Sequence, residues 1–152
     1  MDPNVEHAVE HKRDQRRRLK MSKALKSILY VEDDLHVRTT ATLVMEVIGK
    51  FEVRECSSGR EALVAARDFY PDLILLDMLM PELDGVNTLA MLRRMPHLAD
   101  TPAMFVTGLT SEADIARYMD AGAIGVIPKP VMPMRLTGQL HMLWDEHAAA
   151  AV

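Results

Sequence analysis

Five side chains that could bind a metal ion or a phosphoryl group stand just after short apolar runs of the sequence: Glu32, Asp33, Asp77, Thr107 and Lys129. A carboxylate at the end of a buried strand is poorly placed for packing. It is well placed for chemistry, because ligands of parallel α/β sheets bind beyond the carboxyl ends of the strands. The sequence therefore predicts that these five side chains meet at one edge of a sheet.

The three carboxylates indicate a metal site. Like charges raise one another's pKa, so Glu32, Asp33 and Asp77 could not all stay ionised at one sheet edge without a cation. Mg²⁺ fits best, because it takes one or two carboxylates, a carbonyl oxygen and several waters.

The remaining two side chains suit phosphoryl transfer. Lys129 supplies a positive charge and Thr107 a hydroxyl donor, and both could stabilise a phosphoryl group in transfer. Asp77 stands on the predicted central strand with the other groups around it, which makes it the best nucleophile. Attack by its carboxylate would form an aspartyl phosphate, a known class of covalent intermediate.

Short apolar runs alternate with amphipathic stretches from Ala24 onward. Five runs are predicted to be strands: Leu25–Val31, Phe51–Cys56, Leu73–Leu76, Ala103–Val106 and Ala123–Ile127. Helix-length segments follow each of them, which predicts an α/β fold with a parallel sheet covered on both faces. We expect the flavodoxin-like, doubly wound (βα)5 arrangement with strand order 2-1-3-4-5.

Some polar residues at predicted helix starts have a structural explanation. Asp34 and Asp84 each directly precede a helical segment, so we interpret them as N-caps in preference to metal ligands. Ser111 to Asp114 has the form of a capping box, and the helix that it starts runs past Ile115 and Met119.

The last predicted helix begins near Pro133. It turns three leucines inward, Leu136, Leu140 and Leu143. Trp144 stands at the edge of this apolar stripe, and Gly138 in the helix interior costs about 1 kcal/mol relative to alanine.

Taken together, these motifs resemble the receiver domain of two-component response regulators. The matching residues are the acidic pair within residues 28–34, the Asp77…Met80-Pro81…Asp84-Gly85 block, Thr107 and Lys129-Pro130. The resemblance covers about residues 26–147 and implies that a histidine kinase or a histidine phosphotransfer protein phosphorylates Asp77.

The resemblance also implies a set of ligands for Mg²⁺. Asp33 would bind the ion directly, Glu32 through a water molecule, and the backbone carbonyl of Leu79 would complete the set with Asp77. Lys129 would contact the phosphoryl oxygens.

Two further roles are implied by the same resemblance. A cis peptide bond to Pro130 would shape the loop that carries Lys129. Thr107 would move toward the phosphoryl group and couple it to the surface formed by the fourth helix, the fifth strand and the fifth helix.

Two features depart from the family pattern. Val126 stands three residues before Lys129, where the family usually carries an aromatic partner for the threonine, so the coupling from Thr107 is expected to differ. Leu79 and Leu109 are apolar where side chains of the family border the path of the attacking water. They predict slow autodephosphorylation.

Length and composition suit one domain with a full core, since the chain has 152 residues of which 49% are hydrophobic. We expect a basic, flexible or helical extension over residues 1–24, a receiver domain over residues 25–147 and a tail over residues 148–152. Residues 11–26 carry eight basic side chains and one acidic side chain, so this segment has a charge of 8 − 1 = +7, whereas the whole chain has a net charge of −4. The acidic remainder suits the binding of cations better than the binding of nucleic acid.

The expected location is the cytoplasm. A single cysteine, Cys56, fits a reducing compartment, and the first twenty residues contain no apolar stretch that could serve as a secretory signal. The longest apolar runs are shorter than the roughly 20 residues of a membrane span.

These features predict a single-domain, phospho-accepting response regulator that signals through protein contact. We expect no DNA-binding domain, a downstream protein target, and no enzymatic activity beyond its own phosphorylation and dephosphorylation. A homodimer is left open. The alternatives are an interaction module without phosphorylation, a segment of a longer regulator or kinase, and a haloacid-dehalogenase-type phosphatase. The phosphatase fits less well, because Leu79 stands where that family needs a second aspartate.

Overall fold

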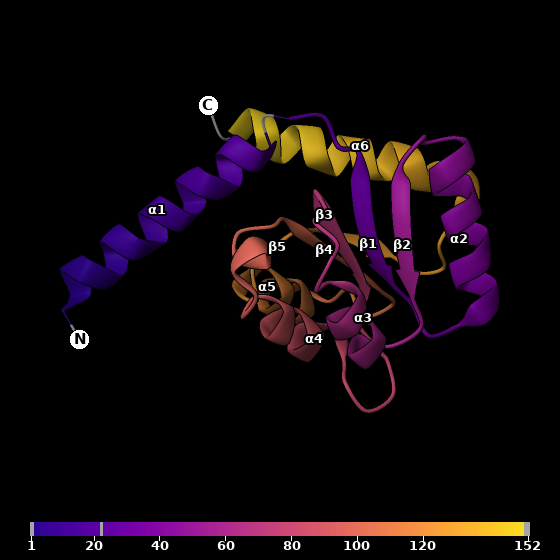
Figure 1. Ribbon diagram of the computed structural model, residues 1–152, viewed down its shortest axis with the longest axis horizontal. Coiled ribbons are helices and arrows are strands. Elements are labelled where there is room, and N and C mark those ends of the chain that lie inside the picture. Colours follow the sequence, from indigo (N-terminus) through magenta and orange to yellow (C-terminus); the bar gives the residue numbers. More distant parts are fainter. Residues whose placement is uncertain (1, 22, 151–152) are drawn as a thin grey trace.

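A parallel sheet of five strands forms the centre of the molecule (Figure 1). The computed structural model describes residues 2–21 and 23–150, and the strands within it are β1 (Ser27–Val31), β2 (Glu52–Cys56), β3 (Leu73–Asp77), β4 (Ala103–Thr107) and β5 (Ala123–Pro128). Their order in the sheet is β2-β1-β3-β4-β5, and every neighbouring pair is parallel. The predicted flavodoxin-like fold with strand order 2-1-3-4-5 is confirmed.

Helices connect the strands and cover both faces of the sheet. The helices of the described residues are α1 (Pro3–Met21), which precedes the first strand, then α2 (Leu35–Val47), α3 (Gly59–Ala65), α4 (Gly85–Leu92), α5 (Glu112–Asp120) and α6 (Pro133–Ala150), with a short 3-10 helix at Pro96–Leu98. The predicted N-caps are confirmed, since the side chain of Asp34 accepts from two backbone amides of α2 and that of Asp84 accepts from the amide of Asn87. Ser111 caps α5 in the same way.

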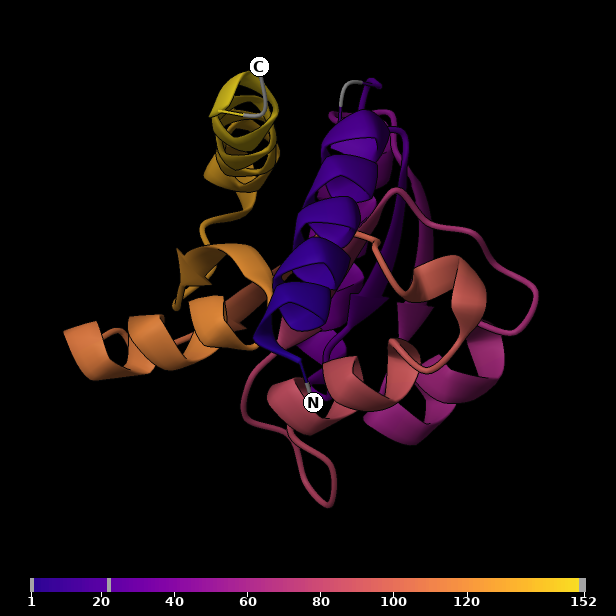
Figure 2. The same ribbon diagram turned by 90° about the vertical axis from the view of Figure 1, so that its left-hand side faces the viewer.

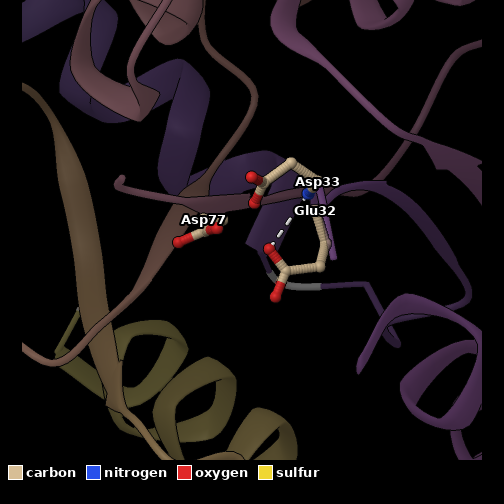
Figure 3. Close-up of side chains that lie close together, drawn as sticks. All are labelled: Glu32, Asp33 and Asp77. Carbon is tan, nitrogen blue, oxygen red and sulfur yellow. Dashed lines mark hydrogen bonds between the residues drawn. The ribbon is translucent and has the colours of Figure 1, made fainter. Parts of the chain in front are cut away.

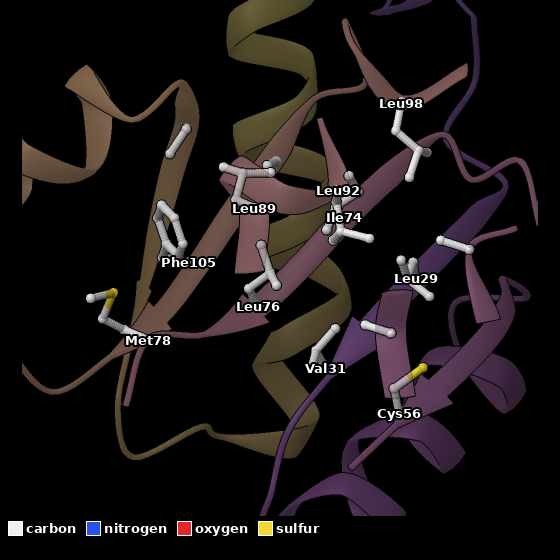
Figure 4. Packing of buried hydrophobic residues seen from close by; sticks show 14 of the residues in the cluster. Leu29, Val31, Cys56, Ile74, Leu76, Met78, Leu89, Leu92, Leu98 and Phe105 are labelled. Carbon is white, nitrogen blue, oxygen red and sulfur yellow. The ribbon is translucent and has the colours of Figure 1, made fainter. Parts of the chain in front are cut away.

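The two faces of the sheet have separate hydrophobic cores. One core packs α2 and α6 against the sheet through residues such as Met45, Leu140 and Trp144. The other packs α3, α4 and α5 against the opposite face, and Figure 4 shows part of it around Ile74, Leu76 and Phe105. Because β3 and β4 are buried along their whole length, their ends are held rigidly by packing on both sides.

Helix α1 leaves this body, and Figure 1 shows it projecting away from the sheet. Figure 2 gives the same helix from the side, beside the C-terminal part of α6. Its described side chains are exposed, and Arg16 forms an ion pair with Asp100 at 3.2 Å. The side chains of Arg17, Arg18 and Lys20 lie outside the described residues, as do Ala151 and Val152 of the expected tail.

The segment after α1 is fastened to the last helix. The indole Nε1 of Trp144 donates a hydrogen bond to the backbone carbonyl of Lys23 at 3.1 Å, and the ring itself is buried. Leu143 is only partly buried and covers Gly125 of β5. Within the described residues, no helix is long and apolar enough to cross a lipid bilayer.

Candidate functional site

The carboxyl edge of the sheet brings three acidic side chains together (Figure 3). Asp77 is the last residue of β3, while Glu32 and Asp33 directly follow the adjacent strand β1. One carboxylate oxygen from each of the three lies within 4.8 Å of the others. Glu32 and Asp77 are buried and Asp33 is exposed, so the cluster opens to solvent on the side of Asp33.

Lys129 is the cation of this cluster. Its Nζ lies 2.8 Å from Asp77 Oδ1 and 3.9 Å from Glu32 Oε1. It follows β5 in a loop held by a hydrogen bond from its own amide to the carbonyl of Thr107, and its peptide bond to Pro130 is cis, as the resemblance implied. Burial lowers the pKa of Lys129, but the hydrogen bond to Asp77 and the nearby carboxylates outweigh it and leave the pKa raised.

The acidic groups repel one another, and their pKa values respond. Burial raises the pKa of Glu32 to about 8, and the adjacent Asp77 adds to this rise while Lys129 opposes it. Although Asp33 is exposed, partial loss of hydration raises the pKa of its carboxyl group, and the adjacent Asp77 raises this pKa further. By contrast, the pKa of Asp34 is lowered, because the helix amides that it caps favour its charged form. The cluster therefore holds less positive charge than its three carboxylates would need to stay ionised.

This arrangement fits a hard divalent cation. Asp77 Oδ2 is buried and, within the described part of the chain, has no hydrogen-bond partner. Such an oxygen costs free energy unless a metal ion or another group binds it. Clustered carboxylate oxygens, one of them without a partner among the described residues, are the kind of hard oxygen donors that Mg²⁺ binds.

The loop after β3 holds the site closely. The amide of Leu79 donates to Asp77 Oδ1 at 3.3 Å, and the amide of Gly85 donates to the carbonyl of Met78 at 2.9 Å. A Cβ atom on Gly85 would lie 2.6 Å from the backbone oxygen of Asp77 and 3.1 Å from Cε1 of Phe105. Glycine is therefore required where α4 begins against the end of β3.

On the other side of Asp77, the neighbouring strand β4 ends in Thr107. Its hydroxyl accepts from the amide of Leu109 at 3.0 Å and lies 3.4 Å from the hydroxyl of Tyr118. Tyr118 comes from α5, is 0% exposed and donates to the carbonyl of Leu109 at 3.0 Å. Its ring packs on Phe105 with the centroids 5.3 Å apart. Thr107, Tyr118 and Leu109 therefore form one hydrogen-bond network, which we call the Thr107 network.

A groove of about 620 Å³ adjoins the charged cluster. It lies between the beginning of α2 and the loop from β5 to α6. The groove is lined by Glu32, Asp34, His36, Val37, Thr40, Ala41, Lys129, Pro130, Val131 and Pro133. A partner could therefore approach Lys129 and Glu32 from this side.

All five residues singled out from the sequence lie at this edge, and Leu79 lies beside them. Sequence reasoning missed Tyr118. It noted only Ile115 and Met119 along this helix, but Met119 is 42% exposed and Tyr118 takes the buried position. The available signal was Val126, whose small side chain indicated that another residue partners Thr107. The roles of the site residues stay predictions.

Comparison with known proteins agrees with this geometry. The model of the response regulator receiver domain family matches residues 28–141. The probable transcriptional regulator ycf27 of Porphyra purpurea is 32% identical over 120 residues, which are 79% of this chain and 48% of that protein. The DNA-binding response regulator MtrA of Mycobacterium leprae is 32% identical over 115 residues, covering 74% of this chain and 48% of that protein. The chain thus spans about half the length of these curated relatives.

Solved structures give the same result. The chemotaxis protein CheY4 of Vibrio cholerae superposes with a TM-score of 0.73 at 28% identity, covering 79% of this chain and 99% of that one. A CheY-like receiver domain protein of Methanospirillum hungatei gives a TM-score of 0.70 at 26% identity, covering 84% and 99%. Receiver domains are phosphoryl-accepting signalling modules that bind Mg²⁺ at an acidic pocket and act with histidine kinases. The family match, the relatives and the arrangement of the acidic edge agree, and the chain belongs to the response regulator receiver domain family.

Proposed function

We propose that this protein is a response regulator whose Asp77 accepts a phosphoryl group in a Mg²⁺-dependent reaction. The observation that carries the proposal is the state of the Asp77 carboxylate, which is 1% exposed and has one oxygen, Oδ1, held by Lys129. The other oxygen, Oδ2, has no hydrogen-bond partner among the described residues. A buried carboxylate oriented in this way is prepared to bind a cation and to attack a phosphorus atom.

Each side chain of the edge has a part in the proposed transfer. Asp33, Glu32 and Asp77, with the backbone carbonyl of Leu79, would hold Mg²⁺, which supplies positive charge for the phosphoryl oxygens when bound. An Asp77 carboxylate oxygen attacks the phosphorus of a phosphohistidine, the N–P bond breaks, and the imidazole nitrogen keeps the electron pair and takes up a proton. Lys129 moves from Asp77 toward the transferred oxygens and neutralises them.

The proposed donor is a histidine kinase or a histidine phosphotransfer protein. The groove beside Lys129 supports this assignment, because it is open at the surface and ends at the charged cluster. His36, Val37 and Pro130 give it both polar and apolar lining for a protein partner. We assign the activity to residues 25–147, with a downstream protein as the target of the phosphorylated form.

The test uses the full chain with Mg²⁺ and acetyl phosphate, followed by intact-mass measurement. We expect the wild-type protein to gain one phosphoryl group, and Asp77→Asn to gain none because the nucleophile is lost. Asp120→Asn, which removes an exposed carboxylate at the end of α5, is the matched control and should be phosphorylated as the wild type is. Omission of Mg²⁺ should also prevent the gain.

Two results would contradict the proposal. One is a wild-type protein that gains no mass from acetyl phosphate or from a phosphorylated histidine phosphotransfer protein, which would leave an interaction module with the receiver fold. The other is continuous phosphate release from small phosphate esters, which would favour a phosphatase.

A further inference from the structure

The Thr107 network has a fixed direction. Tyr118 has a single hydroxyl hydrogen, and it is donated to the carbonyl of Leu109, which can only accept. The contact between the hydroxyls of Tyr118 and Thr107 must therefore use the hydrogen of Thr107. The lone pairs of the Thr107 oxygen accept in turn from the amide of Leu109. The single hydrogen of Thr107 is thus given to Tyr118.

This assignment creates a competition. If Thr107 donates to a phosphoryl oxygen on Asp77, it must withdraw its hydrogen from Tyr118, because a hydroxyl has only one to give. The contact between Thr107 and Tyr118 is long, at 3.4 Å, so its loss costs little. The rotation also removes the acceptor of the Leu109 amide. One rotation of Thr107 would therefore remove both hydrogen bonds of its hydroxyl, the one to Tyr118 and the one from the amide of Leu109.

We infer that Tyr118 is the positioning residue that couples Thr107 to α5 and to residues 108–111. The inference rests on the proposed phosphorylation of Asp77.

Packing supports this route. The ring of Tyr118 is enclosed between α5 and β4 and packs on Phe105, so a change at its hydroxyl acts directly on the helix that carries it. Val126 pairs with Phe105 on the adjacent strand and belongs to the same core, but its side chain has no polar atom to compete for Thr107. Gly108 next to Thr107 has no neighbour within 4 Å of its added Cβ, which leaves the loop room to move.

The test compares wild type with Tyr118→Phe, which keeps the ring and removes only the hydroxyl. Beryllofluoride with Mg²⁺ serves as the phosphoryl analogue. Because Tyr118→Phe removes the competitor for the hydrogen of Thr107, we expect beryllofluoride to bind about three-fold more tightly. Hydrogen exchange of residues 108–119 should respond to beryllofluoride less than in wild type. Tyr70→Phe, at an exposed tyrosine, and Val126→Ala should leave the exchange response intact.

Hydrogen exchange of the wild-type protein alone also tests the inference. Beryllofluoride should speed exchange of the Leu109 amide in wild type, since its acceptor leaves. The inference fails if that amide keeps its protection, or if Tyr118→Phe and wild type bind beryllofluoride and respond alike. A wild-type protein that gains no phosphate would instead contradict the proposed function, and the inference with it.

Discussion

On the charged side of the site, ionic groups meet at short distances: Lys129, which follows β5, lies 2.8 Å from Asp77, and the carboxylates of Glu32 and Asp33, which follow β1, lie beside them. On the packed side, next to β4, Thr107 meets Tyr118, and the Tyr118 ring packs on Phe105 in a largely apolar core. The charged side depends on the chemical identity of each residue, because only a carboxylate or an ammonium group serves there. The packed side depends on volume and on the hydrogen bonds of the Thr107 network, so an aromatic ring can come from α5 and still reach Thr107.

Among the variants of the two sides, we expect the largest effect from Lys129→Met. It should affect the chemistry of the charged side and leave the packed side unchanged. The substitution leaves the transferred phosphoryl oxygens without their ammonium partner, so we expect phosphorylation of Asp77 to slow by about 100-fold. Intact-mass time courses with acetyl phosphate measure this rate. Lys26→Met, at an exposed lysine, is the matched control. An unchanged rate in Lys129→Met would show that charge on this side is dispensable.

Gly85 lies between the two sides, and alanine there should disturb both. Its Cβ would meet Asp77 and Phe105, so we expect a loss of about 2 kcal/mol in the free energy of unfolding. Gly138→Ala is the opposite case, because its Cβ enters open space within α6 and should add about 1 kcal/mol. Urea unfolding compares them. Two shifts of the same sign would contradict the packing argument.

The charged side also predicts how stability depends on pH without metal. Burial raises the pKa of Glu32 from 4.5 to about 8 in the folded protein. The folded state therefore holds its proton more tightly than the unfolded state does. The contribution of protonated Glu32 to the free energy of unfolding is full below pH 4.5 and is lost as the pH rises through about 8. The slope is at most about 1.4 kcal/mol per pH unit.

Urea unfolding between pH 5 and 8 in a chelator tests this slope. Asp77→Asn should make the slope shallower, because Asp77 is the second cause, next to burial, of the raised pKa of Glu32. Adding Mg²⁺ should make the slope shallower as well. A stability that rises over this range in the chelator would show that the cluster is not short of positive charge.

The smallest expected effect concerns loss of the phosphoryl group. Leu79 is 57% exposed beside Asp77, where water can reach it. Its side chain is apolar and offers no atom that could orient an attacking water. We expect Leu79→Asn to speed autodephosphorylation about five-fold, well below the gain given by a general base. Loss of phosphate mass with time measures it, with Leu43→Asn on α2 as an exposed control. Equal rates in all three proteins would remove Leu79 from this role.

The same contrast explains what the sequence could predict. The residues of the charged side follow apolar strands, and the topology of a parallel sheet brings strand ends together, so Glu32, Asp33, Asp77 and Lys129 could be grouped before any coordinates. Strands β3, β4 and β5 each end one residue later than predicted, so Asp77 and Thr107 belong to strands, whereas the ends of β1 and β2 agree with the prediction.

The packed side could not be predicted in the same way. In α5, both the Ile115–Met119 and the Ile115–Tyr118 spacings fit a helical stripe. Burial of Tyr118 depends on partners for its hydroxyl, and these come from residues brought close only by folding. Trp144 was expected at the edge of its stripe but is buried, because its indole finds the carbonyl of Lys23 at a distance of 121 positions along the chain.

The position of Trp144 has a practical consequence for spectroscopy. It is the one tryptophan of the chain, and it belongs to the core on the α2 and α6 face, whereas Tyr118 belongs to the core on the opposite face. Its fluorescence will therefore respond to detachment of the Lys23 segment from α6, and remain nearly unchanged when Asp77 is loaded. A fluorophore introduced on α5 is the better optical reporter of signalling in this protein.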